Sequence, residues 1–209
     1  LGAARLGLAK GGRASLADAQ ASASVGQVAL ARLWADALES HGITAAQMLV
    51  TLGDLEDRRR YLNAAATLSR LLDMGVVPVV NENDSVATEE IRFGDNDRLA
   101  ARVAQAAGAE AVALLSDVDG LYDRDPREPG AVLVDRVEGV SPAVFAMAGE
   151  GSSSGLGSGG MKAKLQAARI AERAGIALAI VNGTHDRPLA RALDRGIGTL
   201  FVAQGAEGA

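Results

Sequence analysis

The sequence predicts an α/β fold, a three-layer αβα sandwich built around a mostly parallel open sheet. Short apolar runs alternate along the chain with segments of 3.6-residue periodicity, which is the pattern of parallel strands separated by covering helices. The run from Val76 to Val80 is apolar throughout, as expected of a parallel strand buried on both faces. Glycine, proline and aspartate separate these segments and mark the turns between them.

In the first half of the chain, periodicity predicts two long helices and two strands. Residues 18–41 form an amphipathic helix whose apolar positions include Val25, Val28, Leu30, Leu33 and Leu38. A strand is expected at 48–52. Asp54 is a suitable N-cap for a second helix that runs to Gly75, and the strand at 76–80 follows.

The second half continues the alternation. Helices are expected at 95–108, 141–148, 160–174 and 186–195, and strands at 111–115, 131–137, 176–181 and 199–202. Between them, residues 117–130 form a long excursion rich in Asp-Gly, Asp-Pro and Pro-Gly pairs, and a loop of this length in a compact domain is usually functional. No segment resembles a linker between domains, so we expect one domain over residues 1–209.

Composition excludes several classes of site and partner. The 209 residues contain no cysteine and two histidines, which excludes disulfides, thiolate nucleophiles and zinc sites built from Cys or His. A net charge of -5 and 3% aromatic residues argue against nucleic-acid binding. No apolar stretch reaches the roughly 20 residues of a transmembrane helix. We therefore expect a cytoplasmic protein that binds any anionic substrate through a few locally placed lysine side chains and not through a basic surface.

A glycine-rich segment, residues 151–164, leads directly into the predicted helix at 160–174. Glycines let the backbone approach a phosphate, and a helix N-terminus offers unpaired N–H groups. Lys164 adds a cation one turn inside the helix. The same composition is equally typical of a flexible surface loop. The segment is neither a Walker A loop nor a dinucleotide-binding fingerprint, because both patterns require other spacings or another position in the chain.

Two acid-amide clusters, Asn-Glu-Asn-Asp at 81–84 and Gly-Asp-Asn-Asp at 94–97, follow the strand at 76–80. Such residues are common in turns and helix caps, which is the simpler explanation of either cluster alone. Their proximity at strand ends favours a site that binds the ammonium of an amino acid, orients lysines, or holds magnesium through water. Ser116 to Gly120 forms a third polar segment after a strand; by itself it is an ordinary Asp-Gly turn.

Taken together, these segments resemble the amino acid kinase family. The stretches that carry the resemblance are Val-Pro-Val-Val-Asn-Glu-Asn-Asp, Phe-Gly-Asp-Asn-Asp, Leu-Leu-Ser-Asp-Val-Asp-Gly-Leu-Tyr, Gly-Leu-Gly-Ser-Gly-Gly-Met-Lys-Ala-Lys-Leu and the segment from Asp57 to Asn63. The resemblance covers nearly the whole chain.

The resemblance implies ATP-dependent phosphorylation of the γ-carboxylate of L-glutamate to L-glutamyl 5-phosphate, the first step of proline biosynthesis, with Mg2+ on the nucleotide. It implies that Lys164 neutralises the transferring phosphoryl group and that Asp97 holds the lysines in place. Asp84, Asn96 and Asp95 would contact glutamate. The nucleotide would be bound by Ser116, Asp117, Ser158, Gly159, Gly160, Met161, Lys162, Ala163 and Lys164.

The chain departs from the family pattern at its start, because the family's first strand, with its Lys-x-Gly-Ser loop, and the following Ser-Ser-Gly-Ala turn are not in this sequence. We expect an N-terminally incomplete kinase domain without a C-terminal PUA domain. The resemblance further implies a homo-dimer or homo-tetramer, with the 18–41 helix as a candidate interface, and feedback inhibition by L-proline through residues 85–94. Two alternatives remain open: a relative that phosphorylates aspartate, acetylglutamate, carbamate or a nucleoside monophosphate, and a non-catalytic amino-acid-sensing module.

Overall fold

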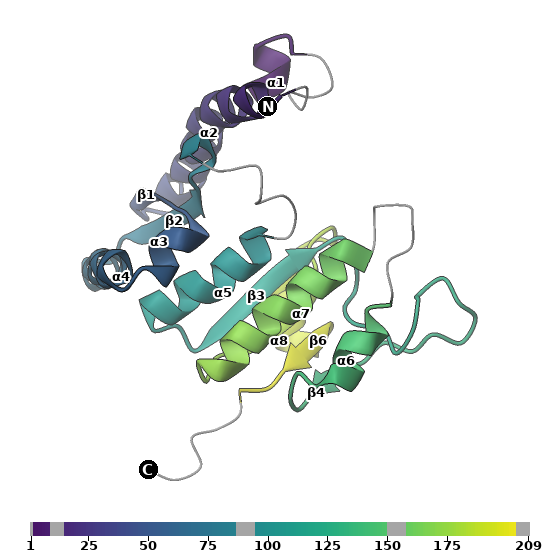
Figure 1. Ribbon diagram of the computed structural model, residues 1–209. Coiled ribbons are helices and arrows are strands. Elements are labelled where there is room, and N and C mark those ends of the chain that lie inside the picture. Colours follow the sequence, from purple (N-terminus) through teal and green to yellow (C-terminus); the bar gives the residue numbers. More distant parts are fainter. Residues whose placement is uncertain (1, 9–14, 87–94, 150–157, 204–209) are drawn as a thin grey trace. The chain divides into compact units, whose positions relative to one another are not determined.

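A computed structural model describes residues 2–8, 15–86, 95–149 and 158–203 (Figure 1). Internal contacts divide the chain into two compact units, residues 1–92 and 93–209, and each is considered by itself. The acid-amide cluster at 81–84 lies within the described residues, whereas the cluster at 94–97 and the glycine-rich segment extend into ranges outside them, namely 87–94 and 150–157. The proposed proline-binding segment, 85–94, falls mostly in the first of these ranges.

Unit 1 contains a parallel strand pair and its connecting helices. Its elements are α1 (Gly2–Arg5), α2 (Leu16–Glu39), β1 (Ala45–Val50), α3 (Leu52–Glu56), α4 (Arg58–Asp73), β2 (Val77–Glu82) and the short 3-10 helix η2 (Asp84–Val86). Strands β1 and β2 run parallel, with Ala45 opposite Val77 and Val50 opposite Glu82. Because parallel neighbours need a crossover connection, α3 and α4 occupy the sequence between them.

The helix predicted from Asp54 to Gly75 is two helices, and this corrects the sequence analysis. Thr51 caps α3: its hydroxyl accepts from the backbone N–H of Asp54 at 3.1 Å, while the Asp54 carboxylate accepts from the Thr51 N–H at 2.8 Å. Asp57 has extended backbone angles, ends α3 and caps α4 by accepting from the Arg60 N–H at 2.9 Å. Since Thr51 leaves the strand to form a cap, β1 ends at Val50 and the predicted strand 48–52 lies too far along the chain.

Two apolar elements of unit 1 are less buried than the sequence suggested. Helix α2 has no buried residue, and Val28 and Leu33 are 69% and 61% exposed. The predicted interface on α2 stays a prediction. Strand β2 was expected to be fully buried, yet Val77 is exposed and the next four positions are half-buried. In the described part of unit 1, β2 pairs with β1 alone. The strand therefore has a neighbour on one edge only, and its apolar residues are not fully buried.

Unit 2 is built on a four-stranded sheet. Its elements are α5 (Asp95–Ala107), β3 (Ala111–Ser116), β4 (Arg136–Val137), α6 (Pro142–Met147), α7 (Ser158–Arg173), β5 (Ala177–Asn182), α8 (Pro188–Arg195) and β6 (Thr199–Phe201). The strand order is β3-β5-β6-β4, and only the β5–β6 pair is antiparallel. Of the predicted strand 131–137, residues 136–137 form β4, and Leu133 makes an isolated bridge to Tyr122.

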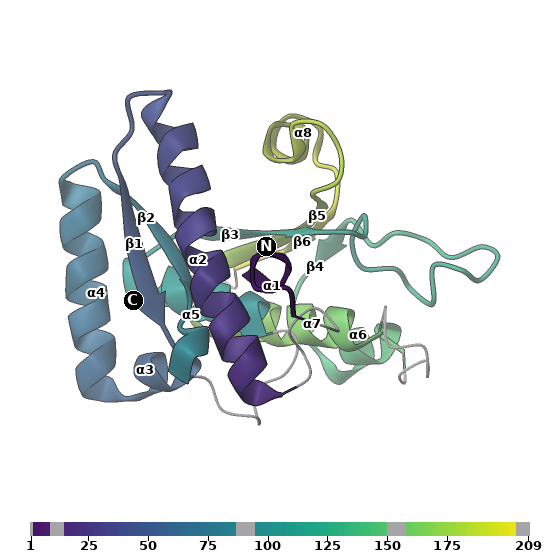
Figure 2. The same cartoon turned by 90° about the horizontal axis from the view of Figure 1, so that it is seen from above.

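The layers of unit 2 follow the prediction. Figure 2 shows α8 on one face of the sheet and α5, α6 and α7 on the other. The core lies between α7 and the strands, where Leu165, Leu178 and Ile180 are at most 1% exposed. The α/β class with mostly parallel strands is therefore confirmed, whereas the expectation of a single domain stays a prediction.

Candidate active site

The carboxyl ends of β3 and β5 define one edge of the unit 2 sheet. The two strands are parallel and in register, so that Ser116 at the end of β3 lies opposite Asn182 at the end of β5. Helices α5 and α7 lead through short turns into β3 and β5 and therefore begin at this same edge (Figure 1). Ligands of open α/β sheets bind at this edge, and the sequence places polar residues at all four element ends.

Lys164 and Asp97 meet at this edge. The Lys164 Nζ donates to the Asp97 Oδ2 at 2.9 Å, joining the second turn of α7 to the first turn of α5. Their side chains are 14% and 21% exposed, so the ammonium is largely removed from water and the carboxylate compensates its charge. An ammonium has three donors and this contact uses one. The others can meet an anion while Asp97 fixes the position of the nitrogen.

Helix α7 begins at Ser158, two residues before the predicted start. Ser158, Gly159, Gly160, Met161, Lys162 and Ala163 therefore form its first turns and not a loop. The first N–H groups of a helix have no partner within the helix and favour an anion. A Cβ added at Gly160 would meet no atom within 4 Å, which shows open space beside this turn.

The side chains of the first turns of α7 differ in where they point. Met161 packs against the core, and Ala163 is 5% exposed and buried beneath the helix. Lys162 is exposed. The side chain of Ala163, one of the residues expected to bind the nucleotide, is therefore not accessible to it.

A polar cluster that the sequence analysis missed lies beside Ser116 and Asp117. Asn182 Nδ2 donates to Asp119 Oδ1 at 2.8 Å, and Tyr122 donates to Asp119 Oδ2 at 3.4 Å. His185 Nε2 lies 3.5 Å from Asp119 Oδ1. The Asn182 hydrogen bond is the main reason that the pKa of Asp119 is lowered, while burial and the Asp119 charge raise the pKa of Tyr122. The signal for Asn182 was its place directly after the predicted strand 176–181.

Ser116 and Asp117 contact each other. The Ser116 hydroxyl donates to Asp117 Oδ1 at 3.2 Å, and the Ser116 carbonyl accepts from the Gly183 N–H at 2.7 Å. The backbone bond continues the β3–β5 ladder by one residue. It holds the first residue of the Ser-Asp-Val-Asp-Gly segment in place at the sheet edge.

The predicted glutamate contacts are divided between the two units. Asp84 lies in η2 of unit 1, where partial desolvation raises the pKa of its carboxyl although the residue is exposed. Asn96 lies in the first turn of α5 in unit 2 and is also exposed, and the side chain of Asp95 is outside the description. The structure therefore brings together Lys164 and Asp97, and it leaves the grouping of Asp84 with Asn96 as a prediction.

Comparison with known proteins decides the family. The sequence profile of the amino acid kinase family matches residues 3–182, which is most of the chain. The chain belongs to the amino acid kinase family.

The curated relatives of this family member include proteins named glutamate 5-kinase, and three of them serve as examples. The chain is 69% identical to that of Novosphingobium aromaticivorans over 98% of its own length and 54% of the relative. It is 68% identical to that of Sphingopyxis alaskensis over 98% and 55%, and 60% identical to that of Zymomonas mobilis over 97% and 51%. The chain thus spans about half the length of the curated relatives that it matches.

Solved structures share the fold at low sequence identity. E. coli aspartokinase III in complex with aspartate and ADP superposes with a TM-score of 0.59 at 23% identity, covering 92% of this chain and 42% of that one. The T. acidophilum isopentenyl phosphate kinase gives 0.57 at 19% identity, covering 88% and 70%. These likenesses confirm the amino acid kinase fold predicted from sequence.

Within the described residues, no group of three or more histidine, aspartate or glutamate side chains is arranged to hold a metal ion. None of the described helices is long and apolar enough to cross a membrane.

Proposed function

We propose that this amino acid kinase phosphorylates the γ-carboxylate of L-glutamate with ATP, producing L-glutamyl 5-phosphate and ADP. The choice of glutamate is supported by identities of 60–69% to proteins named glutamate 5-kinase along nearly the whole chain. The observation that carries the chemistry is the Lys164–Asp97 ion pair beside the start of α7. In this role the protein serves proline biosynthesis in the cytoplasm.

The reaction needs positioning and charge stabilisation more than covalent chemistry. A γ-carboxylate oxygen of glutamate attacks the γ-phosphorus of ATP. A new O–P bond forms, the bond from that phosphorus to the β,γ-bridging oxygen breaks, and ADP leaves with the electron pair. Lys164 faces the charge that builds on the transferring group, Asp97 keeps the ammonium in place, and the first turns of α7 hold the phosphates.

Other groups complete the site. Ser116 and Asp117 line the nucleotide pocket, and Asp84, Asn96 and Asp95 contact the amino acid. Magnesium, which supplies charge neutralisation when bound, prefers water and phosphate oxygens to an all-protein cage. We propose that it arrives on the nucleotide, and no step is assigned to a protein-bound ion. L-proline acts as feedback inhibitor, and the protein works as a homo-dimer or homo-tetramer.

A glutamyl hydroxamate assay with ATP and magnesium tests the proposal. It is run on the 209-residue chain and on a version extended to the length of the relatives, with aspartate, acetylglutamate, carbamate and a nucleoside monophosphate as competing acceptors. Hydroxamate formed from glutamate in either version supports the proposal. If a folded, extended protein binds ATP and turns over another acceptor, or none, the glutamate assignment is wrong.

Variants of the ion pair test the chemistry separately. At about 4 Å and an effective dielectric near 20, a lysine–phosphoryl charge pair contributes about 4 kcal/mol. Loss of one preorganised donor of this kind typically lowers kcat by about 10²–10³-fold. We expect this loss in Lys164→Ala with a smaller change in KM, whereas Lys162→Ala, on the exposed side of the same helix, should lose much less. Equal losses in both variants would remove the special role of Lys164.

The Asp97→Asn variant should lose less activity than Lys164→Ala because the ammonium remains. In the double variant the two losses should not add, since Asp97 acts through Lys164. Additive losses would mean that Asp97 does not act by positioning this lysine.

A further inference from the structure

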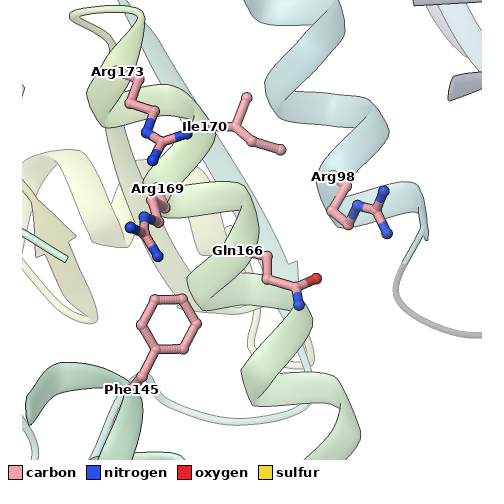
Figure 3. A pocket seen from close by; sticks show the side chains of 6 residues that line it. All are labelled: Arg98, Phe145, Gln166, Arg169, Ile170 and Arg173. Carbon is pink, nitrogen blue, oxygen red and sulfur yellow. The ribbon is translucent and has the colours of Figure 1, made fainter. Parts of the chain in front are cut away.

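A second cleft of unit 2, of about 530 Å3, lies away from the proposed catalytic residues. It is bounded by α5, α6 and α7, and Figure 3 shows the six side chains that line it: Arg98, Phe145, Gln166, Arg169, Ile170 and Arg173. Three of these side chains are guanidinium cations, and none of the six described side chains is acidic.

The arrangement of the arginines is unusual for a merely solvated face. Arg169 and Arg173 are four residues apart on α7, and like charges at this spacing destabilise a helix. Arg173 lies in the last turn, where the helix dipole favours a cation, but this explains Arg173 alone. Arg169 and Arg173 thus place two cations side by side in a chain whose net charge is -5, while Arg98, which lines the cleft from α5, already has an interaction partner within the protein. A local excess of positive charge in an acidic protein suggests an anionic partner.

Arg169 is also held in place. Its guanidinium carbon lies 6.0 Å from the centroid of the Phe145 ring, at the outer limit of a cation–π contact. In Figure 3 the Arg169 guanidinium lies between this ring and Arg173. Orienting a long side chain in advance reduces the entropy lost when a ligand binds.

We propose that this cleft binds a small oxyanion that carries two or more phosphate or carboxylate groups. Guanidinium groups pair with such groups through two parallel hydrogen bonds, and the cleft volume falls within the range of small-molecule sites. The ligand would bind along α7, the helix that carries Lys164. This inference does not depend on the proposed function, because it concerns binding at a separate place.

Inorganic pyrophosphate is the probe for this site. We would titrate it into the isotopically labelled 209-residue chain and follow backbone amide signals by NMR. Signals of residues around Arg98, Phe145 and 166–173 should shift in a saturable manner. In the Arg169→Gln/Arg173→Gln variant these shifts should require at least about tenfold more pyrophosphate, since hydrogen bonds to charged groups each contribute roughly that factor.

Two further variants control for charge and for folding. Arg169→Lys/Arg173→Lys keeps the charges but loses the paired geometry, so its affinity should be intermediate. Arg191→Gln removes one arginine charge from α8, in a cleft that is also lined by Asp186 and Asp194, and should bind like the unchanged chain. Both arginines of the main variant are exposed, so their loss should leave stability nearly unchanged.

The proposal is overturned if the glutamine double variant binds pyrophosphate as well as the unchanged chain. It is also overturned if the shifts are confined to the start of α7 and the end of β3, since that would place the anion in the nucleotide site alone. If a hexaglutamate peptide shifts the cleft signals and pyrophosphate does not, the cleft is a docking surface for an acidic protein segment and not a small-molecule site.

Discussion

The buried hydroxyl of Thr199 links three segments of unit 2, and its removal gives the sharpest test of how the sheet edge is held. Thr199 is 0% exposed. Its Oγ1 accepts from the Leu121 N–H at 2.7 Å and donates to the Val134 carbonyl at 2.6 Å. One side chain of β6 thereby ties Leu121, within the excursion that follows Ser116, to Val134, which lies just beyond that excursion.

The Thr199→Val substitution keeps the shape of the side chain and removes both hydrogen bonds. It leaves a buried donor, the Leu121 N–H, and a half-buried acceptor, the Val134 carbonyl, without these partners, and a fully buried group of this kind costs about 1–3 kcal/mol. We expect a loss of about 2–4 kcal/mol in the free energy of unfolding. For a chain of this size, each kcal/mol lowers Tm by about 2–4 °C, so the midpoint should fall by roughly 5–15 °C.

Denaturant unfolding followed by far-UV circular dichroism measures the loss, and amide hydrogen exchange locates it. The Leu121 amide should exchange faster in Thr199→Val than in the unchanged chain. Thr199→Ser keeps the hydroxyl and should lose about 1 kcal/mol for its missing methyl group. Thr184→Val, an exposed position, should be nearly neutral. A Thr199→Val protein within 0.5 kcal/mol of the unchanged chain, with unaltered Leu121 exchange, would refute the reasoning.

Two further predictions concern local structure. Burial tends to raise the pKa of Asp54, but hydrogen bonds from Thr51 and Arg60 outweigh it and lower the folded-state value below 3.8. Its carboxylate therefore stabilises the fold above pH 3.8, and this contribution disappears as pH falls through the lower, folded-state pKa. Asp54→Ala should cost about 1 kcal/mol at pH 7 in urea unfolding, and a difference that persisted undiminished at pH 2 would contradict this. Gly198→Ala should cost several kcal/mol, because its Cβ would approach the Ile180 carbonyl oxygen at a φ of 121°. Gly196→Ala, with φ of 61° and nothing within 4 Å, should cost only about 1 kcal/mol; equal losses in thermal unfolding would show that backbone strain, and not the clash, decides both.

The periodicity of apolar residues predicted most helices and strands, because an element that buries one face repeats apolar residues along that face. It was wrong where two capping signals competed. Thr51 and Asp57 each begin a helix, and their six-residue spacing allows two short caps where one long helix was predicted from Asp54. The burial of α2 could not be predicted either, since an apolar stripe shows that a face can be buried and not what covers it.

One contact of the candidate site was expected before the structure was known and another was missed, because both join residues that are far apart in the sequence. Asp97 and Lys164 are 67 residues apart, and no local rule pairs them. Their pairing was expected from family resemblance and depends on α5 and α7 packing side by side. The cluster around Asp119 was missed because Asn182 lies on a different strand, and only the β3–β5 register brings the two together.

The geometry of α7 allows one helix to contribute residues to both proposed sites, the one at Lys164 and the one at Arg169 and Arg173. Successive residues of an α-helix are rotated by about 100°, so Lys164 and Arg169 point about 140° apart, while Arg169 and Arg173 point about 40° apart. Lys164 accordingly faces Asp97 and is 14% exposed, whereas both arginines lie on the exposed side. An anion held by these two arginines would thus contact α7 on a side about 140° away from Lys164. The spacing of the three cations therefore places the lysine proposed to face the phosphoryl group and the proposed oxyanion site on different sides of one helix.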